Sequence, residues 1–277
     1  MNNTYFTLDD NFEKIITNTL NTKTILNLKQ IPTGWTNIVY EVETTEGNFF
    51  FRFPRDEFWS RTIVKDYEFA KYIYGKTDFN TAKLEIFYDN GRPFSLHKKI
   101  SGIPLSDVMN DLTLEQVKNI SNEIAKFMYQ LHCLNFNKSK IFTISNIGLN
   151  LTDFLDELLK VHVSENDIKF WYPSSLSSND NYCLVHGDLN SSNILLNENY
   201  HVSAIIDFGF GGFGNKYNDI GRIIGRCPDY FKNEIMKSYE TYSNIKLDDK
   251  LLHTNIETWS NIDNSYINYM RTIGIYE

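Results

Sequence analysis

The sequence predicts an α+β fold of two lobes, a smaller one built on an antiparallel sheet and a larger, mostly helical one. Two observations predict this class. Residues 24–100 are rich in β-branched and aromatic runs, whereas beyond Gly102 apolar residues recur at three- and four-residue steps. Because a short segment joins the two patterns, we place an N-terminal lobe at residues 1–100 and a C-terminal lobe at residues 101–277.

The first lobe carries a series of β-type segments around one helical stretch. In order along the chain, the segments are ILNLKQI, NIVYEVET, NFFFRFP, LEIFY and FSLHKKI. The dipeptide Glu46-Gly47 indicates a hairpin between the second and third, because glycine tolerates the positive φ of a tight turn. Residues 64–75 have a helical pattern. We therefore expect a small, mostly antiparallel sheet accompanied by one helix.

The second lobe opens with an amphipathic helix. Thr113 followed three residues later by Gln116 has the form of a capping box, which marks the start of a helix. Apolar residues then recur at helical spacing, at Leu114, Val117, Ile120, Ile124, Phe127, Met128 and Leu131. The pattern stays helical to the end of the chain, except for one β-hairpin near residue 200. His132, on this helix, is expected to be structural.

Composition and charge exclude several classes of protein. The 277 residues include 35 Asp and Glu against 27 Lys and Arg, and this net charge of -8 disfavours nucleic acid as a partner. No apolar run is long enough for a membrane helix and no signal peptide begins the chain, so we expect a cytoplasmic protein without a membrane partner. The three cysteines form no C-x-x-C pair that would hold zinc.

The segment from Cys183 to Gly221, CLVHGDLNSSNILLNENYHVSAIIDFGFGGFGNKYNDIG, carries the chemistry. Two short β segments follow the loop HGDLNSSN, so the chain goes out and back and returns Asp207 close to Asn193. An amide and a carboxylate oxygen suit Mg²⁺, which shares its coordination sphere with substrate phosphates. Asp188 then lies where it could accept the proton of an attacking hydroxyl.

These motifs resemble the aminoglycoside phosphotransferase and choline kinase superfamily, small-molecule relatives of protein kinases. HGDLNSSN and IIDFG are similar to its catalytic and metal-binding motifs. The resemblance implies a bilobal protein-kinase-like fold, ATP or GTP as cosubstrate and Mg²⁺ as cofactor. It implies Asp188 as the catalytic base and Asn193 and Asp207 as metal ligands, with His186 in structural support.

The resemblance continues through GNKYNDIG, where the family has G-D-P-x-x-D. Gly214 matches the glycine of that motif, and Asp219 matches its second aspartate and is expected to support the site. Asn215 and Lys216 depart from the pattern. The nearby spacing of Gly209, Gly211 and Gly214 also fits G-x-G-x-x-G, but a dinucleotide site would need a βαβ unit with an acidic residue about 20 residues later.

The first lobe resembles the nucleotide-binding lobe of the same superfamily. Gly34 and Asn37 match the turn of the nucleotide-covering hairpin, and Arg52 occupies the position of the strand lysine that contacts phosphates. Glu68 is predicted as the ion-pair partner of Arg52, with Asp66 as the less favoured choice. The segment FSLHKKISGIPL is similar to the bridge between lobes, where backbone groups of Lys98, Lys99 and Ile100 would bind the purine.

Each site residue alone has a structural explanation, such as capping a turn, but the joint motif is hard to obtain by accident. We therefore predict a small-molecule kinase, with an aminoglycoside-type antibiotic phosphotransferase favoured. Metabolic kinases of choline, ethanolamine, amino alcohols or sugars share the motifs, and a nucleotide-binding pseudokinase is a further alternative. Candidate acceptor contacts are Arg222 and Arg226, which lie four residues apart on one predicted helix face, and Glu257, Asp263 and Glu277, which are chosen by position. The two arginines count against a simple polycationic acceptor, although each could instead pair with a nearby carboxylate.

Overall fold

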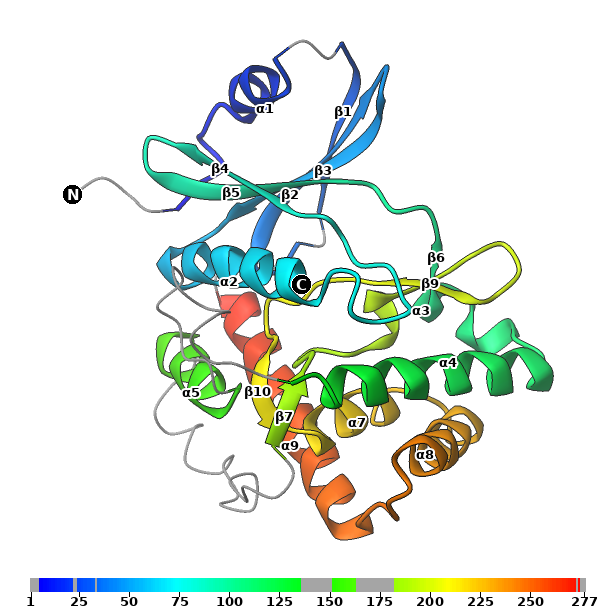
Figure 1. The fold of residues 1–277 in the computed structure, drawn as a ribbon. Helices are drawn as coiled ribbons and strands as arrows, with labels where there is room; N and C mark the ends of the chain where they lie inside the picture. Colours follow the sequence, from blue (N-terminus) through cyan, green and yellow to red (C-terminus); the bar gives the residue numbers. More distant parts are fainter. Residues whose placement is uncertain are drawn as a thin grey trace.

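The computed structural model describes residues 5–21, 24–32, 34–135, 151–162, 182–272 and 274, so Glu277 lies outside the described residues. Its first lobe is an antiparallel sheet with the strand order β1-β2-β3-β5-β4 (Figure 1). The strands are β1 (Ile25–Ile31), β2 (Asn37–Thr44), β3 (Gly47–Pro54), β4 (Glu85–Asp89) and β5 (Arg92–Lys98). The predicted fold class is confirmed: an antiparallel N-terminal sheet with a helix precedes a larger helical part.

The two faces of the sheet have different neighbours because successive strand residues point to opposite sides. Phe51 and Phe53 of β3 are fully buried under α1 (Phe12–Leu20), a helix that the sequence analysis did not predict. Arg52, between them, faces the other side, where α2 (Glu57–Ile73) lies (Figure 1). The hairpin predicted at Glu46-Gly47 is confirmed, with Gly47 at a φ of 118°.

Helix α2 begins seven residues earlier than predicted. Asp56 caps it by accepting a hydrogen bond from the backbone N–H of Trp59 at 2.9 Å, so the aromatic residues after Asp56 are already helical. This start sets which α2 residues face the sheet and the space beneath it.

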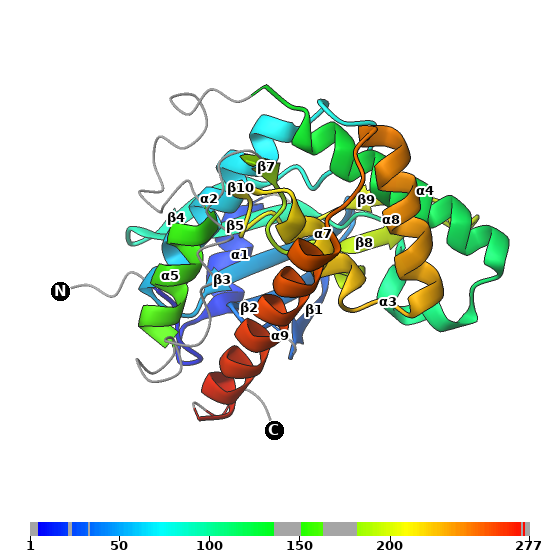
Figure 2. The ribbon, with the colours of Figure 1, turned by 90° about the horizontal axis from the view of Figure 1, so that it is seen from below.

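The larger part of the molecule is mostly helical. Its helices are α3 (Leu105–Val108), α4 (Leu114–His132), α5 (Leu151–His162), α7 (Tyr217–Ile224), α8 (Asp229–Ser243) and α9 (Asp249–Thr272). Seen from below, α4 and α8 lie side by side and α9 runs beside α7 (Figure 2). The capping box predicted at Thr113 and Gln116 is confirmed. None of the helices within the described residues is long and apolar enough to cross a membrane.

Short strands hold the motif segment against these helices. The predicted hairpin is confirmed as β8 (Ile194–Leu196) paired with β9 (Val202–Ile205), and β6 (Ile103–Pro104) joins its edge. β10 (Gly212–Asn215) pairs with β7 (Tyr182–Val185). Gly214 therefore lies in a strand and not at the start of a helix, which removes the basis for a dinucleotide fingerprint.

Candidate active site

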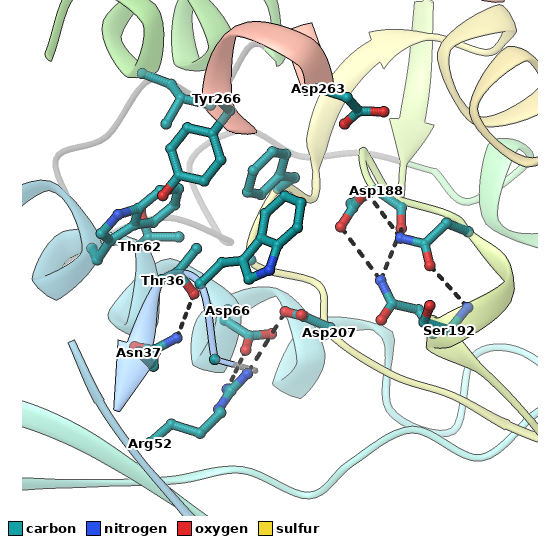
Figure 3. Close-up of a pocket in the computed structure, with 18 of the residues that line it drawn as sticks. Thr36, Asn37, Arg52, Thr62, Asp66, Asp188, Ser192, Asp207, Asp263 and Tyr266 are labelled. Atoms are coloured by element: carbon teal, nitrogen blue, oxygen red, sulfur yellow. Dashed lines mark hydrogen bonds and ion pairs between the residues drawn. The ribbon is translucent and has the colours of Figure 1, made fainter. Parts of the chain in front are cut away.

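A cavity of about 350 Å³ lies where the sheet, α2, the motif loop, α7 and α9 meet (Figure 3). It brings together many of the predicted site residues, which come from distant parts of the sequence. Those that line it are Gly34, Asn37, Arg52, Asp188, Asn193, Asp207, Arg222, Arg226 and Asp263. Among the described residues, Glu68, Glu257 and the segment Lys98 to Ile100 are not part of its lining.

The loop between β7 and β8 is fixed from beneath by one carboxylate. Asp219, fully buried at the start of α7, accepts hydrogen bonds from the backbone N–H groups of His186 at 2.7 Å and Gly187 at 2.8 Å. His132 Nε2 lies 3.3 Å from the same carboxylate. Gly187 has a φ of 79°, and a Cβ there would collide with the carbonyl of Phe210. The supporting position predicted for Asp219 thus has a clear geometric basis.

His186 connects the loop to the strand that precedes Asp207. Its Nδ1 accepts a hydrogen bond from the backbone N–H of Asp188 at 3.2 Å, which places the ring proton on Nε2. Nε2 then donates to the carbonyl of Ile206 at 3.0 Å. These bonds fit the structural role predicted for His186, because they set the distance between Asp188 and Asp207.

The two oxygens of Asp188 have different surroundings. Oδ1 accepts hydrogen bonds from Arg222 Nε at 2.7 Å and Asn190 Nδ2 at 3.1 Å. Among the described residues, Oδ2 has one long contact, 3.5 Å, from Asn193 Nδ2, which also donates to the backbone carbonyl of Asp188 at 3.0 Å. The carboxylate is therefore held at Oδ1, and Oδ2 is the oxygen that a hydroxyl group in the cavity could approach.

Asp207 and Asn193 supply the oxygen donors that magnesium prefers. The hydrogen bond from Ile206 N–H to Asn193 carbonyl, 3.0 Å, holds the two residues together. Asp207 adopts a φ of 65°, and its side chain is 52% exposed toward the cavity. Shielding from bulk water and the nearby Asp66 carboxylate raise the pKa of Asp207 to about 6, against the opposing effect of Arg52. A cation bound here would offset that unfavourable charge, so the two residues fit a magnesium ion.

The structure corrects the predicted partner of Arg52. The guanidinium pairs with Asp66 through Nη2, not with Glu68, and its Nε donates to Ser95 Oγ at 3.0 Å. Burial alone would lower the pKa of Arg52, but Asp66 and Asp207 more than offset it and hold that pKa above its ordinary value. Cavity-lining residues of α2 follow a helical period, at Trp59, Thr62, Ile63 and Asp66. Glu68 is two residues further on and points to a different side of the helix.

The turn between β1 and β2 closes one side of the cavity. The side chain of Asn37 donates to Thr36 Oγ1 at 2.7 Å, while its buried Oδ1 has no hydrogen-bond partner within the described residues. A Cβ at Gly34 would collide with the backbone carbonyl of Asn37, so glycine permits this close turn. Lys99 lies at the end of the sheet, and its backbone N–H donates to the backbone carbonyl of Asn48 at 2.8 Å. A purine site at Lys98, Lys99 and Ile100 stays a prediction.

Two arginines and an aspartate lie at the far end of the cavity from Arg52. Arg222 Nη1 donates to Asp263 Oδ2 at 2.6 Å, and Arg226, in the turn after α7, pairs with the same oxygen. Glu257 instead lies on the exposed side of α9, 3.1 Å from His253. Glu257 does not line this cavity, since it lies six residues from Asp263 and on a different side of the helix, and its role as an acceptor contact stays a prediction.

Residues 27–242 match the model described as the phosphotransferase enzyme family. The chain belongs to this family. Like its other members, the protein is classed as a phosphotransferase, and the match spans the turn at Gly34, the Arg52 strand and the whole motif loop.

Solved structures with the same fold as this phosphotransferase include several kinases of small molecules. A GDP and kanamycin complex of APH(2")-IIia has a TM-score of 0.73 at 18% identity, covering 95% of this chain and 93% of that one. A streptomycin and ATP complex of APH(2")-IIa has a TM-score of 0.64 at 16% identity, covering 95% and 92%. Macrolide 2'-phosphotransferase MphH from Brachybacterium faecium has a TM-score of 0.63 at 13% identity, covering 95% and 93%. At these identities the likeness shows the fold alone.

Sequence reasoning missed part of the cavity of this phosphotransferase. The unpredicted lining residues on α9 are Trp259, Ile262 and Tyr266. Together with Asp263 they follow the three- and four-residue period of one helix face. That period was available in the sequence and would have separated Asp263 from Glu257.

Proposed function

We propose that this phosphotransferase moves the γ-phosphoryl group of ATP or GTP to a hydroxyl group of a small molecule, with Asp188 as the general base. One observation carries the proposal. Asp188, Asn193 and Asp207 all open into one cavity, and Arg52 lies beside Asp207, with 3.6 Å between Nη1 and Oδ1. A base, two magnesium-type ligands and a cation for phosphate are the parts that phosphoryl transfer needs.

Each of these residues has a distinct task in the proposed reaction. Asp188 Oδ2 accepts the proton of the attacking hydroxyl, while Arg222 and Asn190 hold Oδ1 and so orient the carboxylate. Asn193 and Asp207 hold Mg²⁺, which when bound neutralises charge on the phosphate oxygens.

Arg52 complements this arrangement from the sheet. Its guanidinium, held by Asp66 and Ser95, contacts the nucleotide phosphates in the proposed complex. The turn at Gly34 and Asn37 covers those phosphates, and the segment from Lys98 to Ile100 is proposed to bind the purine.

The sequence resemblance favours aminoglycosides as acceptors, which would make the protein an antibiotic-resistance enzyme. The kanamycin and streptomycin named in two of the solved structures support testing this class first. Metabolic kinases that act on choline, ethanolamine or sugars share the same motifs. The proposed reaction is common to all of these acceptors, so the chemistry of the cavity has to distinguish between them.

The test is transfer of labelled γ-phosphate from ATP and from GTP to a panel of hydroxyl compounds, with and without magnesium. Asp188→Asn should lower transfer by about 10² to 10⁴ and leave nucleotide affinity nearly unchanged. Asp9→Asn, an exposed change far from the cavity, is the matched control. Nucleotide binding by the wild type with no transfer to any acceptor or to water would contradict the proposal and favour the pseudokinase alternative.

A further inference from the structure

The acceptor must occupy the end of the cavity that the nucleotide leaves free. Arg52 and the turn at Gly34 mark the nucleotide end, and Asp188 lies between the two ends. Beyond Asp188 the cavity is bounded by α7 and α9, where Asp263 and Tyr266 lie on the side opposite Arg52 (Figure 3). We call this part the acceptor end, and the following steps rest on the proposed function.

The charges at the acceptor end cancel. Within the described lining, the carboxylates there are Asp188 and Asp263, and the guanidinium groups are Arg222 and Arg226. Arg222 lies between the two carboxylates, donating to Asp188 at 2.7 Å and to Asp263 at 2.6 Å. Arg226 adds a second cation on Asp263. A polycationic acceptor would find carboxylates already neutralised and two like charges beside them.

Arg222 is not free to move aside for a cation. Its side chain is only 7% exposed, and its Cζ lies 4.6 Å from the centre of the Trp259 ring. Removing this guanidinium would leave two carboxylates poorly compensated, which is costly in a site shielded from water. The neutralised state is therefore a built property of the acceptor end.

An apolar side of the cavity adjoins the acceptor end and continues toward the turn at Gly34, where the Trp35 ring lies 6.0 Å from that of Tyr266. We define the apolar wall as Trp59, Phe210, Trp259, Ile262 and Tyr266, all of which line the cavity. Trp59 stacks with Phe210 at 6.1 Å between ring centres and meets the edge of Tyr266 at 6.0 Å. Such a wall gains free energy by covering an apolar body of the acceptor, and it offers little to a molecule covered in ammonium and hydroxyl groups.

We propose that the acceptor is a hydroxyl compound with an aromatic or other apolar body and no positive charge. The hydroxyl reaches Asp188 Oδ2, and the body packs on the apolar wall. Arg222 and Arg226 exclude polycations by like-charge repulsion and by occupying the carboxylates that would bind them. Arg226, whose side chain is 41% exposed, also gives an anionic group on the acceptor a cation to approach.

A matched set of probes isolates charge from shape. Phenyllactate, phenylpropanediol and phenylalaninol share one aromatic body and a hydroxyl group but are anionic, neutral and cationic, respectively. Binding is measured on the full chain with Mg²⁺ and a non-hydrolysable ATP analogue, through the fluorescence of tryptophan in the apolar wall. We expect the anionic and neutral probes to bind at least about fivefold more tightly than phenylalaninol, the ratio given by one charge contact at a partly exposed site. Kanamycin should bind more weakly still.

A charge reversal provides the second test. Arg226→Glu should reduce the preference for phenyllactate over phenylalaninol by about fivefold or more, whereas Arg226→Lys should retain it. Arg226 is partly exposed beyond the end of α7, so folding of both variants can be checked by thermal unfolding.

The outcomes separate this inference from the proposed function. Tighter binding of phenylalaninol or kanamycin than of the other probes, or no binding of any aromatic probe, overturns the acceptor class. If the wild type transfers phosphate to none of the acceptors in the presence of Mg²⁺, the proposed function is overturned instead. Transfer to kanamycin in preference to neutral acceptors would leave the kinase proposal standing and sink the inference.

Discussion

Asp66 joins two parts of the site that are far apart in the sequence. One carboxylate oxygen pairs with Arg52 on β3, and the other accepts the backbone N–H of Phe208 at 3.0 Å, next to Asp207. The residue is nearly fully buried, so both bonds are shielded from water. Asp66 therefore sets the position of the phosphate-binding cation relative to the metal ligands.

This role predicts different effects for two neighbouring acidic residues. Asp66→Asn should raise KM for ATP or GTP by about 10 to 100 times, the equivalent of one charge-assisted hydrogen bond. Glu68→Gln, the matched control, should change KM by less than about threefold. Steady-state kinetics with both nucleotides check this prediction. An equal rise in KM in the two variants would restore Glu68 as a candidate partner of Arg52.

His97 gives the protein an acid-sensitive component of stability. Burial and the neighbouring Arg52 lower the pKa of His97 to about 4 in the folded state. Between pH 6.5 and 4 the unfolded chain therefore binds more protons than the folded one, so this stability is present above pH 6.5 and is lost as the pH falls.

Replacing the histidine should remove that sensitivity. When the pH falls from 7 to 4.5, the unfolding free energy of His97→Gln should decrease by on the order of 1 to 3 kcal/mol less than that of the wild type. Urea unfolding at a series of pH values measures the difference. Parallel pH profiles for the two proteins would show that His97 titrates normally.

Some features of the site could be predicted from the local sequence, and others could not. The short hairpin between Asn193 and Asp207 made their proximity predictable, since a chain that goes out and back must return to its start. The partner of Arg52 depended on the rotation of α2, and that rotation depends on where the helix begins. The pairing of Arg222 with Asp188 joins residues 34 positions apart, which no local pattern reveals.

At the scale of elements, helix α7 carries both Asp219, which supports the motif loop, and Arg222, the cation that pairs with the proposed base Asp188. It packs closely on α9: a Cβ at Gly221 would lie 2.8 Å from the Cβ of Asn255. Asp219 and Arg222 flank this glycine. The distance between the two helices therefore controls how Asp219 and Arg222 reach the loop at Asp188.

A single methyl group should disturb this contact. Gly221→Ala is expected to cost about 1 to 3 kcal/mol of stability through overpacking and to lower transfer activity as well. Lys237→Ala, an exposed change on α8, tests that alanine itself is tolerated in a helix. Thermal unfolding with an activity assay provides the measurement, and an unchanged melting temperature would mean that α9 can shift without loss.

The elements differed in how predictable they were. Strands β1 to β5 carry dense runs of β-branched and aromatic residues, and α4 has a capping box with a long apolar face, so local sequence was sufficient. Helix α1 is nine residues long, and its Asn11 cap and its face of Phe12, Ile16 and Leu20 form a shorter signal that the sequence analysis did not use. Its formation depends on packing against Phe51 and Phe53, which come together only in the folded sheet.

On the scale of the whole molecule, the cavity is built from both the sheet lobe and the helical part. A ligand bound there contacts residues from β3, α2, the motif loop and α9 at once. Binding is therefore expected to stabilise the fold as a whole. The lobe boundary at residue 100 stays a prediction that such experiments can address.

Nucleotide with magnesium should raise the melting temperature by several degrees, since ligand at 100 times its Kd adds about 2.7 kcal/mol. Adding EDTA should remove most of the shift if Asn193 and Asp207 hold the magnesium that would neutralise the phosphate charge. Asp207→Asn should show a reduced magnesium-dependent shift. A shift that is the same with and without magnesium would argue against a metal site at Asn193 and Asp207.

The arginine at position 52 also changes which covalent reagents can report on this protein. Nucleotide acyl phosphates label kinases by acylating a lysine amine beside the phosphates, and no lysine is found among the described residues that line the cavity. A survey of a cell extract with such reagents would pass over this protein even if it were abundant and active. Dicarbonyl reagents, which modify guanidinium groups, would be the matching chemistry, with protection by nucleotide as the sign of a specific reaction.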